Sequence, residues 1–188
     1  MAVFLGIQTD KKDTSQPLSV VKPSMKEIKE EELGINLSIP DYYEQRKDTA
    51  IPGQLPAKNF ERPSPQGLLS IRYEKGLAAP ANLSKRTLKE HVKAEIQQFF
   101  PVRYKNYKNI SMQDISVGGR EAIEHNFNYS DAQVLPVRAR LFVIPYDNDS
   151  AYYLIFQSHA SVFDQIAADI EPVIQSIELK GPRLHGAR

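Results

Sequence analysis

The sequence LGINLSIPDYY, residues 33–43, is the stretch that most clearly indicates the fold. Every second position in its first part is apolar: Leu33, Ile35, Leu37 and Ile39. This two-residue period is that of a strand with one buried face, and Pro40 ends it because proline has no backbone N–H to donate to a neighbouring strand. The stretch therefore predicts a first strand that turns one face towards a core.

The same period predicts more strands farther along the chain. Residues 69–73 alternate in this way before a break that begins at Gly76. Strands are also expected at 115–117, 123–129, 137–143 and 151–157. Tight turns separate them, one at Gly118-Gly119 and one at Asp147–Ser150. Because consecutive strands with short turns form antiparallel pairs, we expect a meander here.

Two segments have helical spacing instead. The first is predicted to begin after the capping residue Ser84 and to end at Pro101. Its apolar face consists of Leu88, Val92, Ile96, Phe99 and Phe100. The second is predicted to begin after Ser161, with Asp164 in the capping-box position and Pro172 breaking or kinking it. Its apolar face consists of Phe163, Ile166, Ile170, Val173, Ile174 and Ile177.

The two ends of the chain have a different character. Residues 1–31 are expected to form an N-terminal extension or linker, since the part from Gln8 to Lys26 is polar, contains prolines and has no period. The apolar start, Met1–Ile7, is either the end of a signal or anchor that has been cut away, or an ordinary apolar N-terminus. We expect the folded domain at 32–180 and a flexible tail at 181–188.

Composition excludes several classes of function. The chain has 188 residues, with Lys+Arg 24 against Asp+Glu 23, so its net charge of +1 provides no general attraction for nucleic acid or an anionic membrane. The absence of cysteine excludes disulfides, thiol catalysis and cysteine-ligated zinc. No apolar run approaches the ~20 residues of a membrane-spanning helix.

Four segments resemble a known domain family. Leu37–Tyr43 resembles the strand, Ser-Ile-Pro and aromatic opening of PsbP-like and Mog1-like domains (the Mog1/PsbP/DcrB family), with Tyr43 in place of the usual tryptophan. Val117–Ala122 is similar to the family's glycine-containing turn before a long strand. Tyr152–Phe156 resembles its last strand, and Ile174–Ile177 resembles its closing helix followed by Ser-Ile. The resemblance covers residues 32–180.

The resemblance implies an α+β fold, in which a single antiparallel sheet of about six strands is covered by helices on both faces as an α/β/α sandwich. Family members include photosystem II accessory proteins, bacterial envelope lipoproteins, and adaptors or chaperones of the Mog1 and Eag type. They share no enzymatic activity. The resemblance therefore implies binding or assembly work without a cofactor, by analogy of fold.

No catalytic residue is expected, because the chain has no nucleophile elbow and no spacing that pairs a nucleophile with a base. The histidines lie in four separate elements: His91, His125, His159 and His185. No metal site is expected either, since a hairpin, a strand end and a helix start supply the candidate ligands with no spacing that joins them. The weak candidates are His159, Asp149 and Asp164, with Asp147 beside them.

An aromatic and proline-rich region after the first strand is the candidate partner-binding surface. Its central residues are Tyr42, Tyr43 and Phe60. Rings and fixed dihedrals lose little entropy on docking, but exposed sheet edges must be covered in any case, which favours the alternative that these residues cover an edge of the sheet. The basic stretch Arg103–Lys108, with two interleaved tyrosines, has the composition of a nucleic-acid contact. The near-neutral net charge favours an exposed strand start there instead.

Three hypotheses of function follow. The first is a non-catalytic extracytoplasmic accessory or assembly protein, in the periplasm, cell envelope or thylakoid lumen, that binds another protein or a membrane protein complex. It would contact the membrane only through an N-terminal anchor, and it would not bind nucleic acid. The second is a cytoplasmic adaptor or chaperone that binds a client protein. The third is a small hydrolase, which requires a pocket where His159 or His125 meets a serine or a carboxylate.

Overall fold

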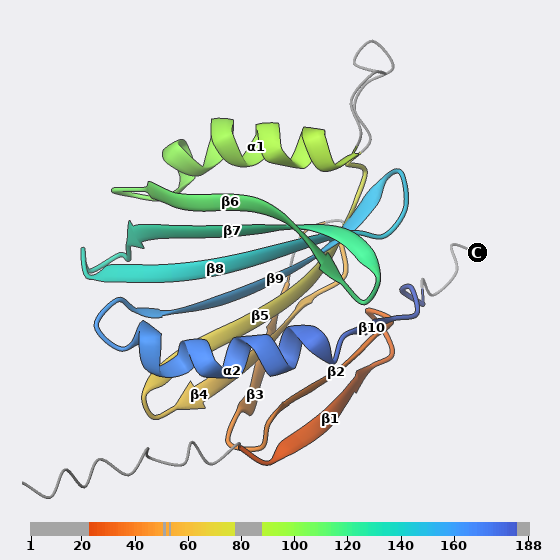
Figure 1. The fold of residues 1–188 in the computed structure, drawn as a ribbon, viewed down its shortest axis with the longest axis horizontal. Coiled ribbons are helices and arrows are strands. Elements are labelled where there is room, and N and C mark those ends of the chain that lie inside the picture. The colour runs from red at the N-terminus through yellow and green to blue at the C-terminus, as the bar shows by residue number, and fades with distance from the viewer. Residues whose placement is uncertain (1–22, 51, 53, 78–87, 184–188) are drawn as a thin grey trace, which may run out of the picture.

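A computed structural model describes residues 23–50, 52, 54–77 and 88–183 (Figure 1). Within these ranges the first five elements are the strands β1 (Met25–Glu30), β2 (Ile35–Pro40), β3 (Glu44–Thr49), β4 (Ala57–Pro63) and β5 (Gln66–Lys75). They are followed by helix α1 (Leu88–Arg103) and the strands β6 (Lys108–Val117), β7 (Arg120–Ser130), β8 (Pro136–Pro145) and β9 (Ser150–His159). Helix α2 (Phe163–Gln175) and the short strand β10 (Glu178–Leu179) complete the fold.

The strands form two antiparallel sheets. The larger is seven-stranded, in the order β3-β4-β5-β9-β8-β7-β6, and the smaller is three-stranded, in the order β1-β2-β10. Strands β6 to β9 follow one another as the expected meander, and β5 pairs with β9 along its length. Gly118 and Gly119 form the two-residue turn between β6 and β7 with φ of 56° and 76°, a left-handed conformation that glycine adopts at little cost.

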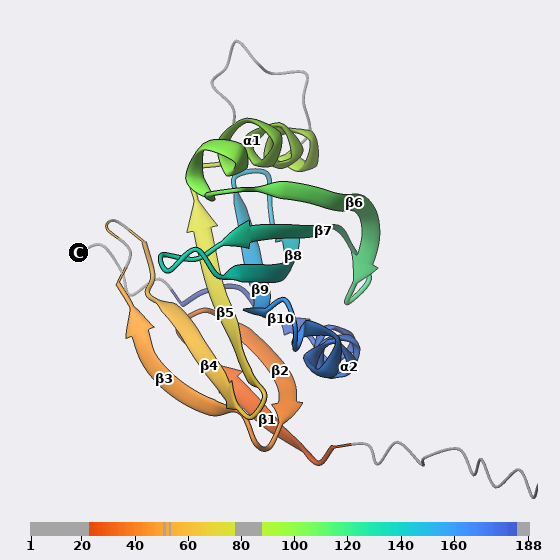
Figure 2. The ribbon, with the colours of Figure 1, turned by 90° about the vertical axis from the view of Figure 1, so that its left-hand side faces the viewer.

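Two hydrophobic clusters lie on opposite faces of the larger sheet, because successive side chains of a strand alternate between faces. One cluster lies beneath α2 and the small sheet, and all four apolar residues of the stretch 33–39 are buried in it. The other lies beneath α1, where Val92, Ile96 and Phe100 pack on β7, β8 and β9. Figure 2 shows α1 and α2 on opposite sides of β7 and β8.

This arrangement confirms the α+β class and agrees with helices on both faces, but the number of strands differs from the sequence prediction. The main sheet has seven strands rather than about six, and β1, β2 and β10 form a separate sheet. The sequence did not predict β1, β3, β4 or β10. Strand β3 is almost entirely exposed and charged, so it has no apolar period to detect.

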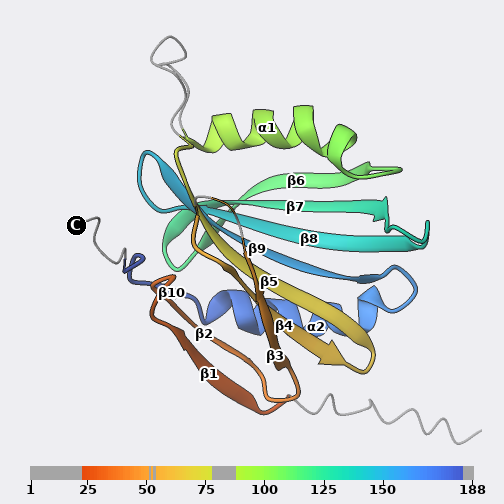
Figure 3. The same cartoon turned by 180° about the vertical axis from the view of Figure 1, so that it is seen from behind.

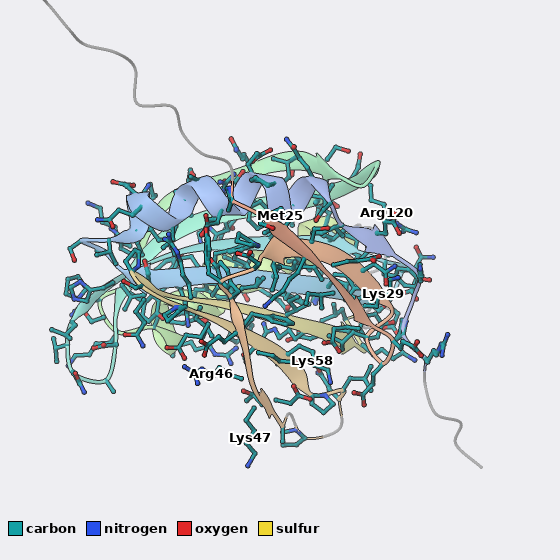
Figure 4. All side chains as sticks on the ribbon, turned by 90° about the horizontal axis from the view of Figure 1, so that it is seen from below. Met25, Lys29, Arg46, Lys47, Lys58 and Arg120 are labelled. Carbon is teal, nitrogen blue, oxygen red and sulfur yellow. The ribbon has the colours of Figure 1, made fainter. Side chains whose placement is uncertain are left out.

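Strand β3 is an outer edge of the larger sheet. Its charged side chains discourage pairing of this edge with a strand of another molecule. Figure 4 shows Lys47 projecting from β3, whereas Lys58 of β4 lies closer to the body of the molecule. The Lys58 Nζ lies 2.7 Å from Asp48, 3.2 Å from Glu32 and 3.7 Å from Glu30. This cluster of charges joins the two sheets.

The predicted boundaries of the domain need a correction at the N-terminal side. Strand β1 lies inside the range 1–31 that was assigned to the extension, and it pairs with β2 from Met25↔Pro40 to Glu30↔Ile35. The folded part therefore begins before Glu32. At the other end, Lys180 N donates to Gly34 O at 2.7 Å and Arg183 N donates to Glu32 O at 3.2 Å, so the start of the predicted tail lies against the β1–β2 turn. Residues 1–22 and 184–188 lie outside the described residues.

The helices also correct three details. Phe100 is buried but Phe99 is 59% exposed, so the prediction that Phe99 belongs to the core is wrong. Neighbouring residues of a helix point about 100° apart, and the spacing of Val92 and Ile96 places Phe100 beneath the helix. Prolines 101 and 172 both lie inside helices that continue past them. The N-cap of α2 is Val162 rather than Ser161, and Ser84 lies outside the described residues.

Neither described helix combines the length and apolarity that a membrane span requires.

Candidate functional site

The α1 side of β5 and β9 is a partly covered surface of the described chain. Helix α1 runs along β6 and β7, while most of β5 lies farther from it (Figures 1 and 3). The cross-strand pairs Leu68↔Gln157, Ser70↔Ile155 and Arg72↔Tyr153 therefore share a face that α1 covers only in part. We call this surface the β5–β9 trough; it consists of Leu68, Ser70, Arg72, Tyr153, Ile155 and Gln157.

Two small cavities lie where the trough meets α1. They have volumes of ~240 Å³ and ~70 Å³, and Arg72, Phe100 and Tyr153 line both. The Arg72 guanidinium lies 4.6 Å from the centre of the Tyr153 ring and forms an ion pair with Glu74 at 2.9 Å. The exposed ring of Phe99 lines the larger of the two. This end of the trough is therefore aromatic, and two arginines line it, Arg72, which is paired with Glu74, and Arg103.

The other end of the trough opens into a larger cavity of ~620 Å³, which we call the end cavity. Three chain segments form its walls: the β4–β5 turn, the neighbourhood of the β7–β8 loop, and the β9–α2 connection. Its lining residues are Glu61, Pro65, Gln66, Gly67, Leu68, Tyr129, Asp131, Val137, Gln157, Ser158, His159, Ser161 and Val162. The rings of Tyr104 and Tyr129 lie 4.9 Å apart between the two ends, so the trough and the end cavity are adjacent.

Hydrogen bonds position the polar groups of the end cavity. The Tyr129 hydroxyl donates to Gln157 Oε1 at 2.9 Å. Burial, with smaller contributions from Tyr104 and Asp131, raises the pKa of Tyr129 to about 12, so this hydroxyl stays protonated and can donate. Asp131 Oδ1 accepts from the backbone N–H groups of Gln133 and Leu135 at 2.9 Å and 2.8 Å, which holds the β7–β8 loop.

The structure separates the metal-ligand candidates. Asp147 and Asp149 lie in the turn before β9, whereas His159 ends β9, ten strand residues later and thus about 30 Å away. Asp164 forms an ion pair with Arg138 at 2.9 Å. Across the residues that the structure describes, no group of three or more His, Asp or Glu side chains could hold a metal ion.

His159 does meet a serine in the end cavity. Its Nδ1 lies 2.9 Å from Ser161 Oγ. The hydrolase hypothesis requires such a meeting of a histidine and a serine in a pocket, and this contact supplies the pair of residues. The pair is exposed, and among the described hydrogen bonds none joins a carboxylate to the imidazole. A catalytic serine needs a base that is itself oriented by a third group and a set of oxyanion donors. The two residues are neighbours in one turn, and the contact lacks that support.

Two of the three predicted partner-binding residues are in the core. Tyr43 is 1% exposed and Phe60 is 0% exposed, so the prediction that they form a docking surface is wrong. Tyr42 is partly buried, and its hydroxyl donates to Asp169 Oδ1 at 2.6 Å. The physical reason is the direction of each strand face, because Phe60 shares its face with Leu69 opposite and points towards α2.

These tyrosines belong to a buried polar cluster that joins α2 to β4 and the β2–β3 turn. Asp169 is 4% exposed, and Tyr43 Oη lies 3.4 Å from its Oδ2. Arg62 Nε lies 3.5 Å from the same oxygen without hydrogen-bond geometry, and its guanidinium lies 5.0 Å from the centre of the Tyr42 ring. Burial is the first cause and Asp169 the second that raise the pKa of both tyrosines. The pKa of Tyr42 is raised to about 12. The cluster therefore links α2 to β4 and the β2–β3 turn through polar contacts.

The remaining sequence candidates are also structural. His125 is fully buried, its Nδ1 lies 3.1 Å from Ser111 O and its Nε2 lies 2.9 Å from the Tyr107 hydroxyl. Burial lowers the pKa of His125, which favours the neutral ring. His91 lies 3.5 Å from Glu95, and His185 is outside the described residues. In the stretch 103–108 the two tyrosine rings pack against the cluster beneath α1, so they are not free to stack on bases.

Sequence reasoning missed both the trough and the end cavity. Their residues come from β4, β5, β7, β8, β9 and the α2 start, which are adjacent only because β5 pairs with β9. One local signal was present: Leu68 and Ile155 are apolar residues in the face of their strands that otherwise carries Ser70, Arg72 and Gln157. Without knowing that β5 pairs with β9, the sequence does not show that Leu68 and Ile155 lie on one shared face.

Comparison with known proteins locates the fold but not a sequence family. No family model and no curated protein matches the chain. A solved structure of the cyanobacterial PsbP protein (CyanoP) from Synechocystis is 11% identical, covers 86% of this chain and 95% of its own length, and gives a TM-score of 0.57.

Two further solved structures are similar at lower TM-scores. LpqN, involved in cell envelope biogenesis of Mycobacterium tuberculosis, is 14% identical, with coverage of 84% and 91% and a TM-score of 0.47. PA94 of Pseudomonas aeruginosa, a protein of unknown function, is 14% identical, with coverage of 76% and 88% and a TM-score of 0.45. The likeness to CyanoP, together with the element order and the helices on both faces of the sheet, shows that this chain has a PsbP-like fold.

Proposed function

We propose that this protein is a non-catalytic accessory or assembly protein that binds another protein through the β5–β9 trough. The observation that carries the proposal is the half-covered sheet face. On this face α1 shields β7 and β8, but Leu68 and Ile155 stay partly exposed and Phe99 is 59% exposed at the margin. Apolar surface gathered in a concave region of a folded domain is typical of a site that another molecule covers.

The dimensions of the trough suit a segment of a protein partner. Leu68 and Arg72 are four residues apart on β5, so the floor is about 13 Å long. An extended segment of about four residues, or a helix of about nine, has the same length. The aromatic end near Phe99 and Phe100 offers the kind of anchor that carries most of the binding energy in protein interfaces.

A binding role without catalysis is supported by the chemistry of the same surface. The contact between His159 and Ser161 is the only pair of base and hydroxyl that the described hydrogen bonds place in the end cavity, and no carboxylate orients the ring. Acyl transfer needs that orientation together with oxyanion donors. We therefore place His159 among the binding residues.

We further propose that the protein works outside the cytoplasm, in an envelope compartment or a thylakoid lumen. The support is the PsbP-like fold. The sequence of residues 32–180 resembles a family that includes envelope lipoproteins and photosystem II accessory proteins, and this resemblance favours the same location. Fractionation of cells that express the tagged full-length gene product would test it. Recovery of the protein with the cytoplasmic fraction, in a stable complex with a cytoplasmic client, would favour the adaptor hypothesis instead.

Site-specific photo-crosslinking tests the binding site. A photoreactive phenylalanine analogue at Phe99 should give one discrete crosslinked partner in the source cells, because this ring lines the aromatic end of the trough. The matched control is the same analogue at Val102, which is also on α1 and 85% exposed but lines none of the described cavities. Equal crosslinking at the two positions, or crosslinking at Val102 alone, contradicts the proposal.

A second variant asks whether the trough itself is needed. Ser70→Arg places a large side chain in the floor without removing a core residue, and it should abolish the crosslink at Phe99. Ser116→Arg, an exposed serine on β6, serves as its control and should leave the crosslink unchanged. If Ser70→Arg folds normally and still crosslinks, the partner binds elsewhere.

A further inference from the structure

The end cavity has an unusual balance of charge. Its thirteen lining residues include two carboxylates, Glu61 and Asp131, and no lysine or arginine. A phosphate, a carboxylate or another anion would find no cation in these walls and would meet two like charges. The cavity therefore disfavours anionic ligands.

The two carboxylates are not equally available. Glu61 accepts from Arg46 Nε at 2.6 Å through Oε2 and from Gln66 Nε2 at 3.2 Å through Oε1, and these contacts lower its pKa. Asp131 uses only Oδ1, which accepts from two backbone N–H groups of its own loop. Among the described contacts its Oδ2 has no partner, so one oxygen of a charged carboxylate remains free to accept.

The cavity that Asp131 lines also has apolar and aromatic walls. Leu68, Val137, Val162 and the ring of Tyr129 line the same cavity as Asp131. A long side chain with an apolar stem and a cationic head matches both parts, because the stem contacts apolar surface while the head meets a carboxylate or the face of a ring. The cavity volume of ~620 Å³ is within the range of pockets that hold a ligand group of this size.

We propose that the end cavity receives a lysine or arginine side chain of the bound protein, with Asp131 as its charge partner. The inference rests on the proposed function and adds the chemistry of the partner: a basic residue next to the segment that lies in the β5–β9 trough. His159, Ser161 and Gln157 then contact the polar backbone on either side of that residue.

Small probes test the cavity separately from the partner. Backbone amide shifts of Gly67, Asp131 and Ser161 are followed by NMR while the protein is titrated at about pH 8, where imidazoles are uncharged. The probes are N-acetyl-lysine amide and N-acetyl-arginine amide, with the norleucine and glutamate analogues as controls. At least one basic probe should give saturable shifts at all three positions with a dissociation constant of about 1–10 mM, as expected for a single weak anchor.

Substitution of the charge partner sharpens the test. Asp131→Asn keeps Oδ1 as an acceptor for the loop but removes the charge, so binding of the basic probe should weaken at least tenfold at unchanged melting temperature. Asp147→Asn is the matched control, since Asp147 Oδ1 holds the β8–β9 turn by accepting from Asp149 N at 2.8 Å, at the other end of the strands. This variant should bind the probe as wild type does.

Three outcomes overturn the proposal: equal binding of norleucine and lysine probes, preference for the glutamate probe, or no saturable shift with either basic probe. An unchanged affinity in Asp131→Asn also overturns it. If the basic probes fail while Phe99 still crosslinks to a partner, the binding role of the trough stands and only the cavity assignment fails. If both fail, the binding role fails with it.

Discussion

Removing the carboxylate of Asp169 should destabilise the protein more than any change on the exposed face of the same helix. Asp169 is 4% exposed, and Asp169→Ala leaves Arg62, whose side chain is 14% exposed, without its counter-charge. The hydroxyl of Tyr42 also loses an acceptor at 2.6 Å. Breaking a buried ion pair on one side costs about 3–5 kcal/mol. The better helix propensity of alanine offsets about 0.5 kcal/mol of this loss.

The control is on the same helix. Glu171 is exposed and its carboxylate lies 3.7 Å from the half-buried Arg140, and an ion pair open to solvent on one side at this distance contributes at most about 1 kcal/mol. Urea unfolding curves of wild type, Asp169→Ala and Glu171→Ala should share one slope and differ in midpoint. For a domain of this size the expected fall in melting temperature is roughly 5–18 °C for Asp169→Ala, at about 2–4 °C per kcal/mol.

Tyr42→Phe separates the hydrogen bond from the charge. It keeps the ring and removes only the donor to Asp169, so it should cost about 1.5–3 kcal/mol, the range for a hydrogen bond to a charged group. The reasoning is refuted if Asp169→Ala is no more destabilising than Glu171→Ala. In that case the cluster would be a consequence of packing rather than a contributor to stability.

Three further predictions concern the core, a close backbone approach and pH. Phe100→Ala should cost about 3–5 kcal/mol in urea unfolding, whereas Phe99→Ala should change stability by less than about 0.5 kcal/mol, because only the first ring is buried. Gly34→Ala should be far more destabilising than Gly76→Ala, although both glycines have positive φ. A Cβ at Gly34 would lie 1.7 Å from a backbone oxygen, whereas a Cβ at Gly76 would meet nothing within 4 Å. Equal melting temperatures of the two variants would contradict this. Burial lowers the pKa of His125 in the folded protein. The stability that its neutral form contributes is therefore complete above about pH 6.5 and is lost as the pH falls from there through the lowered pKa of the folded state. Between about pH 7 and about pH 5 the unfolding free energy should fall less in His125→Gln than in wild type.

The sequence predicted those elements whose burial repeats at a regular spacing. Strand β2 alternates cleanly, β8 and β9 alternate over part of their length, and α2 has its apolar residues on one face. In α1, Phe99 and Phe100 are both compatible with the spacing from Ile96, and only the packing of the helix on β7 decides between them. Local pattern therefore identifies an element more securely than the direction of a single ring.

The candidate site could not be predicted because its residues meet only through strand order. Tyr43 and Phe60 have the composition of a docking surface, but the pairing of β4 with β5 turns Phe60 inwards. His159 was singled out as a weak metal-ligand candidate and lies in the wall of the end cavity, although its partner Ser161 had been assigned to a helix cap. The wall formed by Leu68, opposite Gln157, depends on a pairing between residues that are distant in the sequence.

The position of β2 has a consequence for synthesis on the ribosome. Its neighbour β10 pairs at Asn36↔Glu178, and Ser38 N donates to Ser176 Oγ across 138 residues of sequence. At about 5–20 residues added per second, β2 is synthesised roughly 7–28 s before Ser176. A nascent chain released before α2 therefore lacks the helix that packs on β2, so the four apolar side chains of residues 33–39 lose part of their cover, and surveillance proteases or chaperones would recognise the chain as incomplete.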